Sequence, residues 1–474
     1  MLRVAVVGSG PSGVYTAQTL VSQDRVPDVR VHVLDRLPCP YGLVRYGVAP
    51  DHEKIKSLQN SLRTVLEHER ITFLGNVEVG GDGIPPERLG ELYDAVVYCV
   101  GAATDRALDV PGEDLPGSRS ATEFVSWYSA HPDAVMDGFA LRARSVVVIG
   151  VGNVAVDVTR ILARSGQELR PTDVPHDALG ALTGSRVHEI HMAGRRGPSQ
   201  ARFTTKELRE LGGLPGARVV VDEAELARDP AYADPSAPAS APPSPPNAPP
   251  PTAAARRNVE VLRGWAAAGA TEAGADGPPA RTIHLRFFLR PVELLERDGR
   301  VAGVRFARTV PDGSGGVRDA GTYEDIAAGL VLRAVGYRGT PLPGLPFDPV
   351  RGTVPHLAGR VLRDGLPSPG EYVAGWIKRG PTGVIGSNRS CAKETVASLL
   401  DDAPRLAGRR SGPDPVAALR AWGLHPVEWD GWLSIERAEA ALGRSLGRER
   451  VKIPDWPGLL SAAHGGGRDD GSGG

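Results

Sequence analysis

The chain has 474 residues, 41% of them hydrophobic and 23% charged, with a formal net charge of -1 at pH 7. This balance is ordinary for a globular protein of roughly two to four domains, and it gives no reason to expect nucleic acid or an acidic membrane as a partner. The three cysteines are scattered, with neither metal-ligand spacing nor a C-x-x-C pair, so we expect no metal site and no redox-active disulfide.

The N-terminus shows no targeting signal. Met1 runs straight into an apolar segment without a basic leader or a cleavage site. No apolar run reaches the ~18 residues that a membrane span requires. We therefore expect a cytoplasmic protein with no membrane span.

The first elements predict a βαβ unit with a phosphate-binding turn. Residues 4–7 form an apolar strand, residues 11–21 have helical spacing, and residues 29–34 form a second strand. The turn reads Gly8-Ser9-Gly10-Pro11-Ser12-Gly13. Gly8 permits the tight turn, Gly10 the approach of a pyrophosphate and Gly13 the packing of helix on strand. Asp35 follows at about the 20-residue distance of a ribose-binding acid, which indicates a dinucleotide without a 2′-phosphate.

A second such unit follows a turn-rich linker. Tyr93 to Gly101 reads as a buried strand, and we place a domain crossing near residue 104. After a strand at 144–149 comes Gly150-Val151-Gly152-Asn153-Val154-Ala155, which opens a helix to about Arg164. Gln167 to Ser185 is expected to be an inserted helix and loop before the strand at 188–193.

The residues after that later strand favour a phosphorylated cofactor. Arg195 and Arg196 are paired guanidinium groups, which can clamp a 2′-phosphate from two sides. Ala155 replaces the last glycine, a looser form of the turn that often occurs in NADP sites. The alternative is a pair of solvated surface arginines. The second unit is therefore predicted to bind NADP(H).

The rest of the chain closes the two domains. Strands of a hairpin or meander are expected at 282–289 and 301–308, a further strand at 330–336, a last strand at 371–375 and a long helix at 383–400. One protein that binds a dinucleotide without a 2′-phosphate and also NADP(H) is most simply a flavoprotein. We predict an α/β fold of two Rossmann-like dinucleotide-binding domains, the NADP domain inserted into the flavin domain. The predicted limits are 1–103 plus 331–463 for the flavin domain and 104–330 for the NADP domain, with a disordered Pro/Ala-rich loop at 234–254 and a disordered tail at 464–474.

A third glycine-rich segment joins the last strand to the long helix. It runs from Gly375 to Gly386, and a helix N-terminus there would stabilise negative charge on a reduced flavin ring. Trp376 is expected to pack near the flavin or nicotinamide; the alternative is an ordinary core aromatic residue.

These elements, in this order, resemble the adrenodoxin-reductase type of ferredoxin–NADP reductase. The string Pro40-Tyr41-Gly42-Leu43-Val44-Arg45-Tyr46-Gly47-Val48-Ala49-Pro50-Asp51-His52 is close to that family's signature. Further matches lie at 111–113, 120–125, 152–155, 195–198, 203–208 and 375–385. The resemblance spans residues 4 to about 452 and departs at the long Pro/Ala-rich loop and at Asp35, where relatives often carry Glu.

The resemblance implies FAD in the first domain and NADP(H) in the second. The family's FAD contacts match Ser12, Asp35, Leu43, Val77, Trp376, Gly383, Val384 and Ile385. Its NADP contacts match Asn153, Val154, Arg195, Arg196 and Glu207. His52 and Glu210 match a His/Glu pair near the nicotinamide, for which we expect an orienting or proton-handling role. Their alternatives are a helix-start residue and a solvated helix face.

The sequence thus predicts an FAD-dependent NADPH:ferredoxin oxidoreductase. Hydride passes from NADPH to FAD, and single electrons then pass to an iron–sulfur ferredoxin, for which a P450 is one candidate acceptor. An acidic ferredoxin in a transient complex would meet a basic rim, for which Lys378, Arg379, Arg389 and Lys393 are candidates. The alternatives are an NADPH-dependent flavin monooxygenase or oxidase and a non-catalytic dinucleotide sensor.

Overall fold

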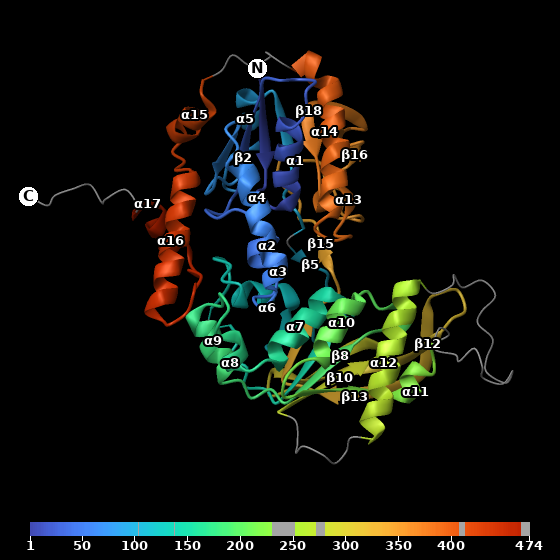
Figure 1. Ribbon diagram of the computed structural model, residues 1–474. Helices are drawn as coiled ribbons and strands as arrows, with labels where there is room; N and C mark the ends of the chain where they lie inside the picture. Colours follow the sequence, from blue (N-terminus) through green and yellow to red (C-terminus); the bar gives the residue numbers. More distant parts are fainter. Residues whose placement is uncertain (103, 137, 230–251, 272–279, 407–412, 466–474) are drawn as a thin grey trace, which may run out of the picture.

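The chain forms two lobes, each built on its own central sheet (Figure 1). The computed structural model describes residues 1–102, 104–136, 138–229, 252–271, 280–406 and 413–465. Both ends of the chain contribute to the upper lobe of Figure 1, and the middle of the chain forms the lower lobe.

The first sheet is a seven-stranded, mostly parallel sheet built from both ends of the chain. Its order is β16-β17-β18-β4-β1-β2-β3, in which the last five strands run parallel and β16 and β17 are antiparallel additions at one edge. The bounds are β1 (Leu2–Val7), β2 (Val29–Leu34), β3 (Ile71–Leu74), β4 (Ala95–Tyr98), β16 (His356–Leu357), β17 (Arg360–Arg363) and β18 (Leu366–Val373).

Helices cover both faces of this sheet because its strands are apolar on both sides. One face carries α1 (Pro11–Val21), α4 (Leu58–Leu66), α14 (Ser387–Leu406), α16 (Trp429–Ser445) and α17 (Trp456–Gly465). The other face carries α5 (Pro86–Leu92) and α15 (Pro415–Ala421). Short helices α2 (Leu43–Tyr46) and α3 (Glu53–Lys56) point toward the lower lobe in Figure 1, and α13 (Trp376–Arg379) follows β18.

The second sheet is entirely parallel, with the order β6-β14-β7-β8-β10-β9. Its strands are β6 (Ser118–Ser120), β7 (Ser145–Ile149), β8 (Glu189–Ala193), β9 (Ala217–Val221), β10 (Arg281–Arg286) and β14 (Leu330–Arg333). One face packs on α6 (Ala121–Tyr128), α7 (Asn153–Ala163), α9 (His176–Thr183), α10 (Thr205–Gly212) and α12 (Ala253–Thr271). Also here are α8 (Gly166–Leu169), α11 (Glu223–Leu226) and the 3-10 turn η1 (Pro198–Gln200).

A three-stranded antiparallel meander covers the opposite face of the second sheet. It consists of β11 (Leu289–Arg297), β12 (Arg300–Pro311) and β13 (Val317–Ala327). The predicted strand at 282–289 was wrong in one respect: residues 281–286 form β10, which joins the parallel sheet, and the meander begins only at Leu289. The chain turns at Phe288, whose φ is 57°, and this break separates the two strands.

The two connections between the lobes pair with each other. β5 (Thr104–Asp105) is antiparallel to β15 (Tyr337–Arg338), so the outward crossing near residue 104 lies against the return crossing. The return crossing expected at residue 331 was placed too early, because residues 330–333 are β14 and pair with β7 inside the second sheet. The chain returns to the first lobe only after β14. Apart from this limit, one lobe is inserted into the other as expected.

Three further expectations concern the ends of elements. The long helix starts at Ser387 and not at Gly383, so Gly383 to Gly386 remain a loop. The Pro/Ala-rich loop lies outside the described residues up to position 251, and its last two residues begin α12. The tail from 466 onward also lies outside them, and His464 and Gly465 complete α17. Among the helices of the described residues, none has the length and apolarity that a membrane crossing requires.

Candidate cofactor and redox site

The first glycine turn has the shape of a phosphate cradle. Gly8 has a φ of 107°, a conformation that favours glycine. A Cβ on Gly13 would lie 1.8 Å from the Gly8 carbonyl oxygen, so α1 packs onto the turn only without a side chain at Gly13. The space beside Gly10 is open, because the nearest atom to a Cβ there would be the Gly42 Cα at 3.9 Å. The buried hydroxyl of Ser12 has no hydrogen-bond partner among the described residues.

Asp35 stands at the end of β2, directly beside this turn. Its Oδ2 accepts hydrogen bonds from the Ser9 amide at 2.8 Å and the Ser9 hydroxyl at 2.5 Å, and its Oδ1 accepts from the Leu37 amide at 2.9 Å. Burial raises the pKa of the Asp35 carboxyl, and the bonds from Ser9 and Leu37 oppose that rise. Because a carboxylate offers about four lone-pair positions, Oδ1 keeps acceptor capacity for a ribose hydroxyl.

The second turn repeats this geometry at the end of β7. Gly150 has a φ of 141°, and a Cβ on it would lie 2.2 Å from the Ala334 carbonyl oxygen. Gly152, which begins α7 as its N-cap, has no atom within 4 Å of the position of a Cβ. The Asn153 side chain accepts a hydrogen bond from the Thr204 amide at 3.0 Å, which ties this turn to the start of α10.

Arg195 and Arg196, the arginine pair that the sequence predicts to bind a 2′-phosphate, follow β8 near this turn. Arg195 is exposed and Arg196 half-buried. Neither guanidinium has a hydrogen-bond or ion-pair partner within the described parts of the chain. Glu207, in contrast, is already engaged, because its carboxylate and Thr204 form the capping box of α10. Arg195 and Arg196 therefore leave two guanidinium groups near the second turn that could bind a phosphate.

The remaining predicted flavin residues differ in exposure. Val77 is buried, and its amide donates to the Asp35 carbonyl at 2.8 Å. Leu43 is 41% exposed and Val384 65% exposed, while Ile385 packs against the core of the first lobe. Trp376 begins α13, and its buried indole N–H has no acceptor among the described residues.

Two of the four expected rim cations are turned inward. Lys378 is only 5% exposed, and its Nζ donates to Thr395 Oγ1 at 3.0 Å. Arg379 is half-buried and donates to Asn388 Oδ1 at 3.1 Å. α13 is a single turn that places both side chains against α14, so the prediction of a basic rim was wrong for these two residues. Arg389 and Lys393 are exposed on α14.

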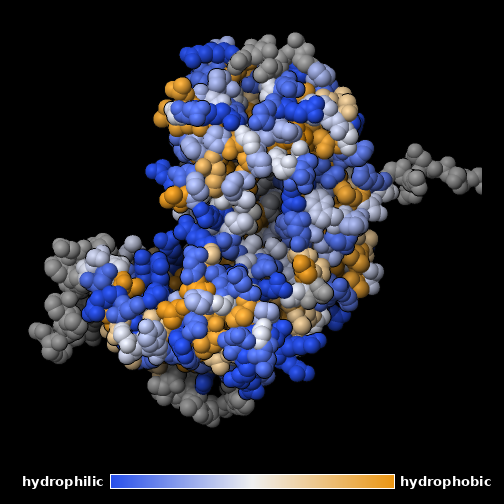
Figure 2. Space-filling model, turned by 180° about the vertical axis from the view of Figure 1, so that it is seen from behind, coloured by the Kyte–Doolittle hydropathy of each residue, from blue (hydrophilic) through white to orange (hydrophobic). Residues whose placement is uncertain are grey.

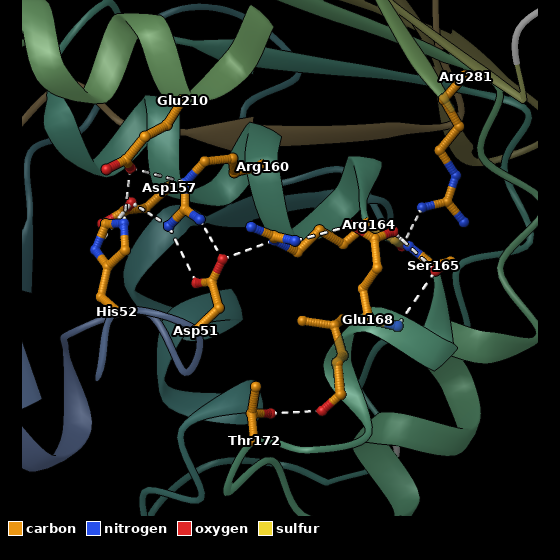
Figure 3. Close-up of polar contacts among 11 residues, drawn as sticks. Asp51, His52, Asp157, Arg160, Arg164, Ser165, Glu168, Thr172, Glu210 and Arg281 are labelled. Atoms are coloured by element: carbon orange, nitrogen blue, oxygen red, sulfur yellow. Dashed lines mark hydrogen bonds and ion pairs between the residues drawn. The ribbon is translucent and has the colours of Figure 1, made fainter. Parts of the chain in front are cut away.

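His52 and Glu210 meet where the two lobes face each other (Figure 3). The Nε2 of His52 lies 2.9 Å from Glu210 Oε2. His52 stands at the start of α3 in the first lobe, and Glu210 lies in α10 of the second lobe. His52 stands at the N-cap of α3 and makes no capping bond with its side chain. The space-filling view shows a hollow between the lobes, seen from behind (Figure 2).

The sequence reasoning missed the charged cluster that supports this pair. Arg160 on α7 contacts both oxygens of Asp51, donates to Asp157 at 2.9 Å and lies 3.8 Å from Glu210 (Figure 3). Burial raises the pKa of Asp51, but its ion pairs with Arg160 and Arg164 outweigh this and lower it; at Asp157 burial prevails and the pKa is raised. The spacing of Asp157 and Arg160 on one face of α7 was the only available signal.

Another group of possible ligands lies between the second sheet and the meander. The ligand atoms of Glu189, His191 and His284 lie within 4.8 Å of one another. The two imidazole rings stack with centroids 4.5 Å apart and planes at 10°, so an ion in the plane of one ring lies out of the plane of the other. Glu189 already accepts from His284 at 2.6 Å, and we assign no metal to this group.

The fold and its paired cradles define the class of protein. Residues 2–210 match the family model described as pyridine nucleotide-disulphide oxidoreductase. All three cysteines are free and buried, so the structure contains no disulfide among them.

The full-length relatives then define the family. The chain is 42% identical to the NADPH-ferredoxin reductase FprA of Mycobacterium leprae, over 98% of both chains. It is 40% identical to the mitochondrial NADPH:adrenodoxin oxidoreductase of Homo sapiens, over 96% of this chain and 90% of that one. The solved structure of Mycobacterium tuberculosis FprA in complex with NADPH superimposes with a TM-score of 0.85 at 41% identity, over 98% and 99% of the two chains. The chain belongs to this family of reductases, which confirms the resemblance.

Proposed function

We propose that the chain is an FAD-dependent NADPH:ferredoxin oxidoreductase. The observation that carries this proposal is the contrast between its two cradles, one beside an acid and the other beside two free arginines. Membership of the reductase family supports the same cofactors. When bound, FAD accepts a hydride from NADPH and releases electrons singly.

The first cradle fits FAD on three observations. The open face beside Gly10 admits a pyrophosphate, and the start of α1 supplies free amides and the positive end of a helix dipole. The unpartnered Ser12 hydroxyl and Asp35 Oδ1 are available to phosphate and ribose oxygens. Trp376 and the loop of Gly383, Val384 and Ile385 would line the flavin ring, with Leu43 and Val77 completing the site.

The second cradle fits NADP(H) in the same way. Gly152 leaves room for the pyrophosphate at the start of α7, with Asn153, Val154 and Glu207 around it. Arg195 and Arg196 bind the 2′-phosphate. His52 and Glu210 orient the nicotinamide side of the site and hold a proton between His52 Nε2 and Glu210 Oε2.

The acceptor in this proposal is a small acidic iron–sulfur ferredoxin in a transient complex. The cluster belongs to the partner, because the three buried cysteines of this chain supply no set of cluster ligands. Arg389 and Lys393 on α14 offer positive charge next to the 383–386 loop. A P450 is one candidate for the protein that the ferredoxin reduces.

The decisive test uses the Arg195→Ala/Arg196→Ala double variant. Charge-assisted hydrogen bonds contribute about 1.5–3 kcal/mol each. Because the variant removes two guanidinium groups, kcat/KM for NADPH should fall by about two to four orders of magnitude, while that for NADH stays nearly unchanged. Steady-state cytochrome c reduction with added ferredoxin measures both. The exposed Arg218→Ala on β9 is the matched control and should change neither value. Equal losses with both nucleotides would refute the assigned role.

The same preparation separates the alternatives. A reductase shows a flavin spectrum and NADPH-driven electron transfer that depends on ferredoxin and slows with rising salt. A monooxygenase or oxidase consumes oxygen with NADPH and needs no ferredoxin. A sensor binds both cofactors without turnover, and protein that stays colourless in the presence of FAD contradicts the proposal altogether.

A further inference from the structure

A second large hollow lies at the end of the second sheet where its parallel strands begin, opposite the end that carries the glycine turn. Its volume is about 1170 Å³, and Ser118, Ser145 and Leu330 line it. These residues begin the parallel strands β6, β7 and β14, whereas the turn at Gly150 follows the carboxyl end of β7. The hollow is therefore separated from the cofactor site by the length of the sheet.

The walls of this hollow carry an excess of positive charge. Five arginines from three segments line it, against two acids, Asp114 and Asp298. The arginines are Arg119 of β6, Arg142 and Arg144 in the segment before β7, and Arg297 and Arg300 of the meander. Only Arg119 has an ion-pair partner within the described residues, Glu123 at 3.2 Å. The whole chain has a net charge of only -1, so this concentration is local.

The hairpin between β11 and β12 places two of these charges against each other. Arg297 and Arg300 are directly opposite in the ladder, joined by Asp298 and Gly299 with φ values of 56° and 72°. Two positive φ values define a tight turn that fixes this register. Directly opposed like charges destabilise a hairpin, and an anion bound between the guanidinium groups would offset that repulsion.

The floor of the hollow supplies an unpaired donor and apolar surface. The Ser118 hydroxyl is buried and has no partner among the described residues. Leu115, Phe139 and Val301 line the same space. Guanidinium groups bind phosphate oxygens in a fork. Small-molecule sites have volumes of about 300–1,000 Å³, so this hollow has room for such a ligand.

We propose that this pocket, lined by Arg119, Arg142, Arg144, Arg297 and Arg300, is a binding site for an oligophosphate anion, distinct from both dinucleotide cradles. The shared chemistry is a chain of two or three phosphates. Its two possible sources are a nucleotide, whose base would cover the apolar floor, and free inorganic oligophosphate.

Isothermal titration of the FAD-loaded protein tests this with tripolyphosphate and with ATP. The Arg195→Ala/Arg196→Ala protein, titrated in parallel, removes any contribution from the NADP cradle. We expect the FAD-loaded protein to bind the anion at one site that the Arg195→Ala/Arg196→Ala protein retains. In Arg297→Ser/Arg300→Ser the affinity for tripolyphosphate and ATP should fall at least tenfold. The control Arg256→Ser/Arg257→Ser removes the same charge from the exposed face of α12 and should leave the affinity within twofold.

Each result decides the proposal. Tighter binding of ATP than of tripolyphosphate assigns the site to a nucleotide, and equal binding assigns it to free oligophosphate. Absence of binding to the wild-type protein, or binding that the hairpin variant keeps, overturns the proposal. Arg297→Ser/Arg300→Ser changes two exposed side chains, so the protein should fold normally. A melting temperature equal to that of the wild type would verify this.

Discussion

Gly10 and Gly13 belong to one turn, yet the space around them differs completely. A Cβ at position 13 would lie 1.8 Å from a backbone oxygen, whereas one at position 10 would meet nothing closer than 3.9 Å. Gly13→Ala is therefore expected to act on the fold, and Gly10→Ala on the binding of the ligand. This separates two roles that the sequence pattern alone presents as one.

We expect Gly10→Ala to fold normally and to lose affinity for FAD, because the new methyl group occupies the face toward the pyrophosphate. Gly13→Ala should instead lower the free energy of unfolding of the apoprotein by several kcal/mol, since α1 must move away from the turn. Urea unfolding and FAD titration measure the two effects. Gly90→Ala, in α5 with no neighbour within 4 Å, is the control and should stabilise by about 1 kcal/mol. A Gly13→Ala protein as stable as the wild type would contradict this account.

At the scale of the element, α7 serves both sites at once. Its N-terminus forms the second cradle, and further along the helix Asp157 and Arg160 lie at the boundary between the lobes. Arg160 is 1% exposed and contacts three carboxylates, two of them on other elements. Arg164, one turn further along, is 23% exposed, and Asp51 is the only one of these three carboxylates that it also contacts among the described residues.

Arg160→Gln should lower the free energy of unfolding by about 3–5 kcal/mol, because it leaves buried carboxylates without their cation. Arg164→Gln removes the same charge from a more solvated position and should lower it by clearly less. Chemical denaturation of both proteins at pH 7 compares them. Equal losses would mean that Arg160 acts merely as one of two cations on Asp51.

At the scale of the whole molecule, the lobes exchange charged groups in both directions. Asp51 of the first lobe pairs with Arg160 and Arg164 of the second, and Asp173 of the second pairs with Lys56 and Lys452 of the first. Burial acts to raise the pKa of both carboxyls, but the paired cations prevail and lower it. Lys452 lies in the segment between α16 and α17, so the end of the chain helps to hold the lobes together.

These pairs predict that acid loosens the junction between the lobes. A carboxyl whose pKa is lower in the folded than in the unfolded state stabilises the folded state above its unfolded value, near 3.9, and this stabilisation is lost as the pH falls through the lower folded value. We expect the loss of stability below about pH 4 to be smaller in Asp173→Asn than in the wild type. Thermal unfolding between pH 3 and 6 measures it, and parallel curves for the two proteins would exclude Asp173 as a contributor.

Much of the site followed from sequence because glycine turns and their selecting residues are local. The cradles, Asp35 and the arginine pair each depend on a few consecutive residues after a strand, and the pairing of His52 with Glu210 came from family resemblance. The inward orientation of Lys378 was missed, since it depends on how α13 packs against α14. The cluster around Arg160 also needs residues far apart in the chain.

The sequence by itself determined the two glycine turns, the charged residues beside them and the order of the lobes. Backbone conformation at glycine and the charge of the next few side chains are properties of short segments, which a sequence displays directly. The tertiary structure alone decided where the lobes meet, which cations are buried and where β14 belongs. Those outcomes depend on the packing of surfaces contributed by distant segments, and burial sets whether a charged side chain faces solvent or pairs within the protein.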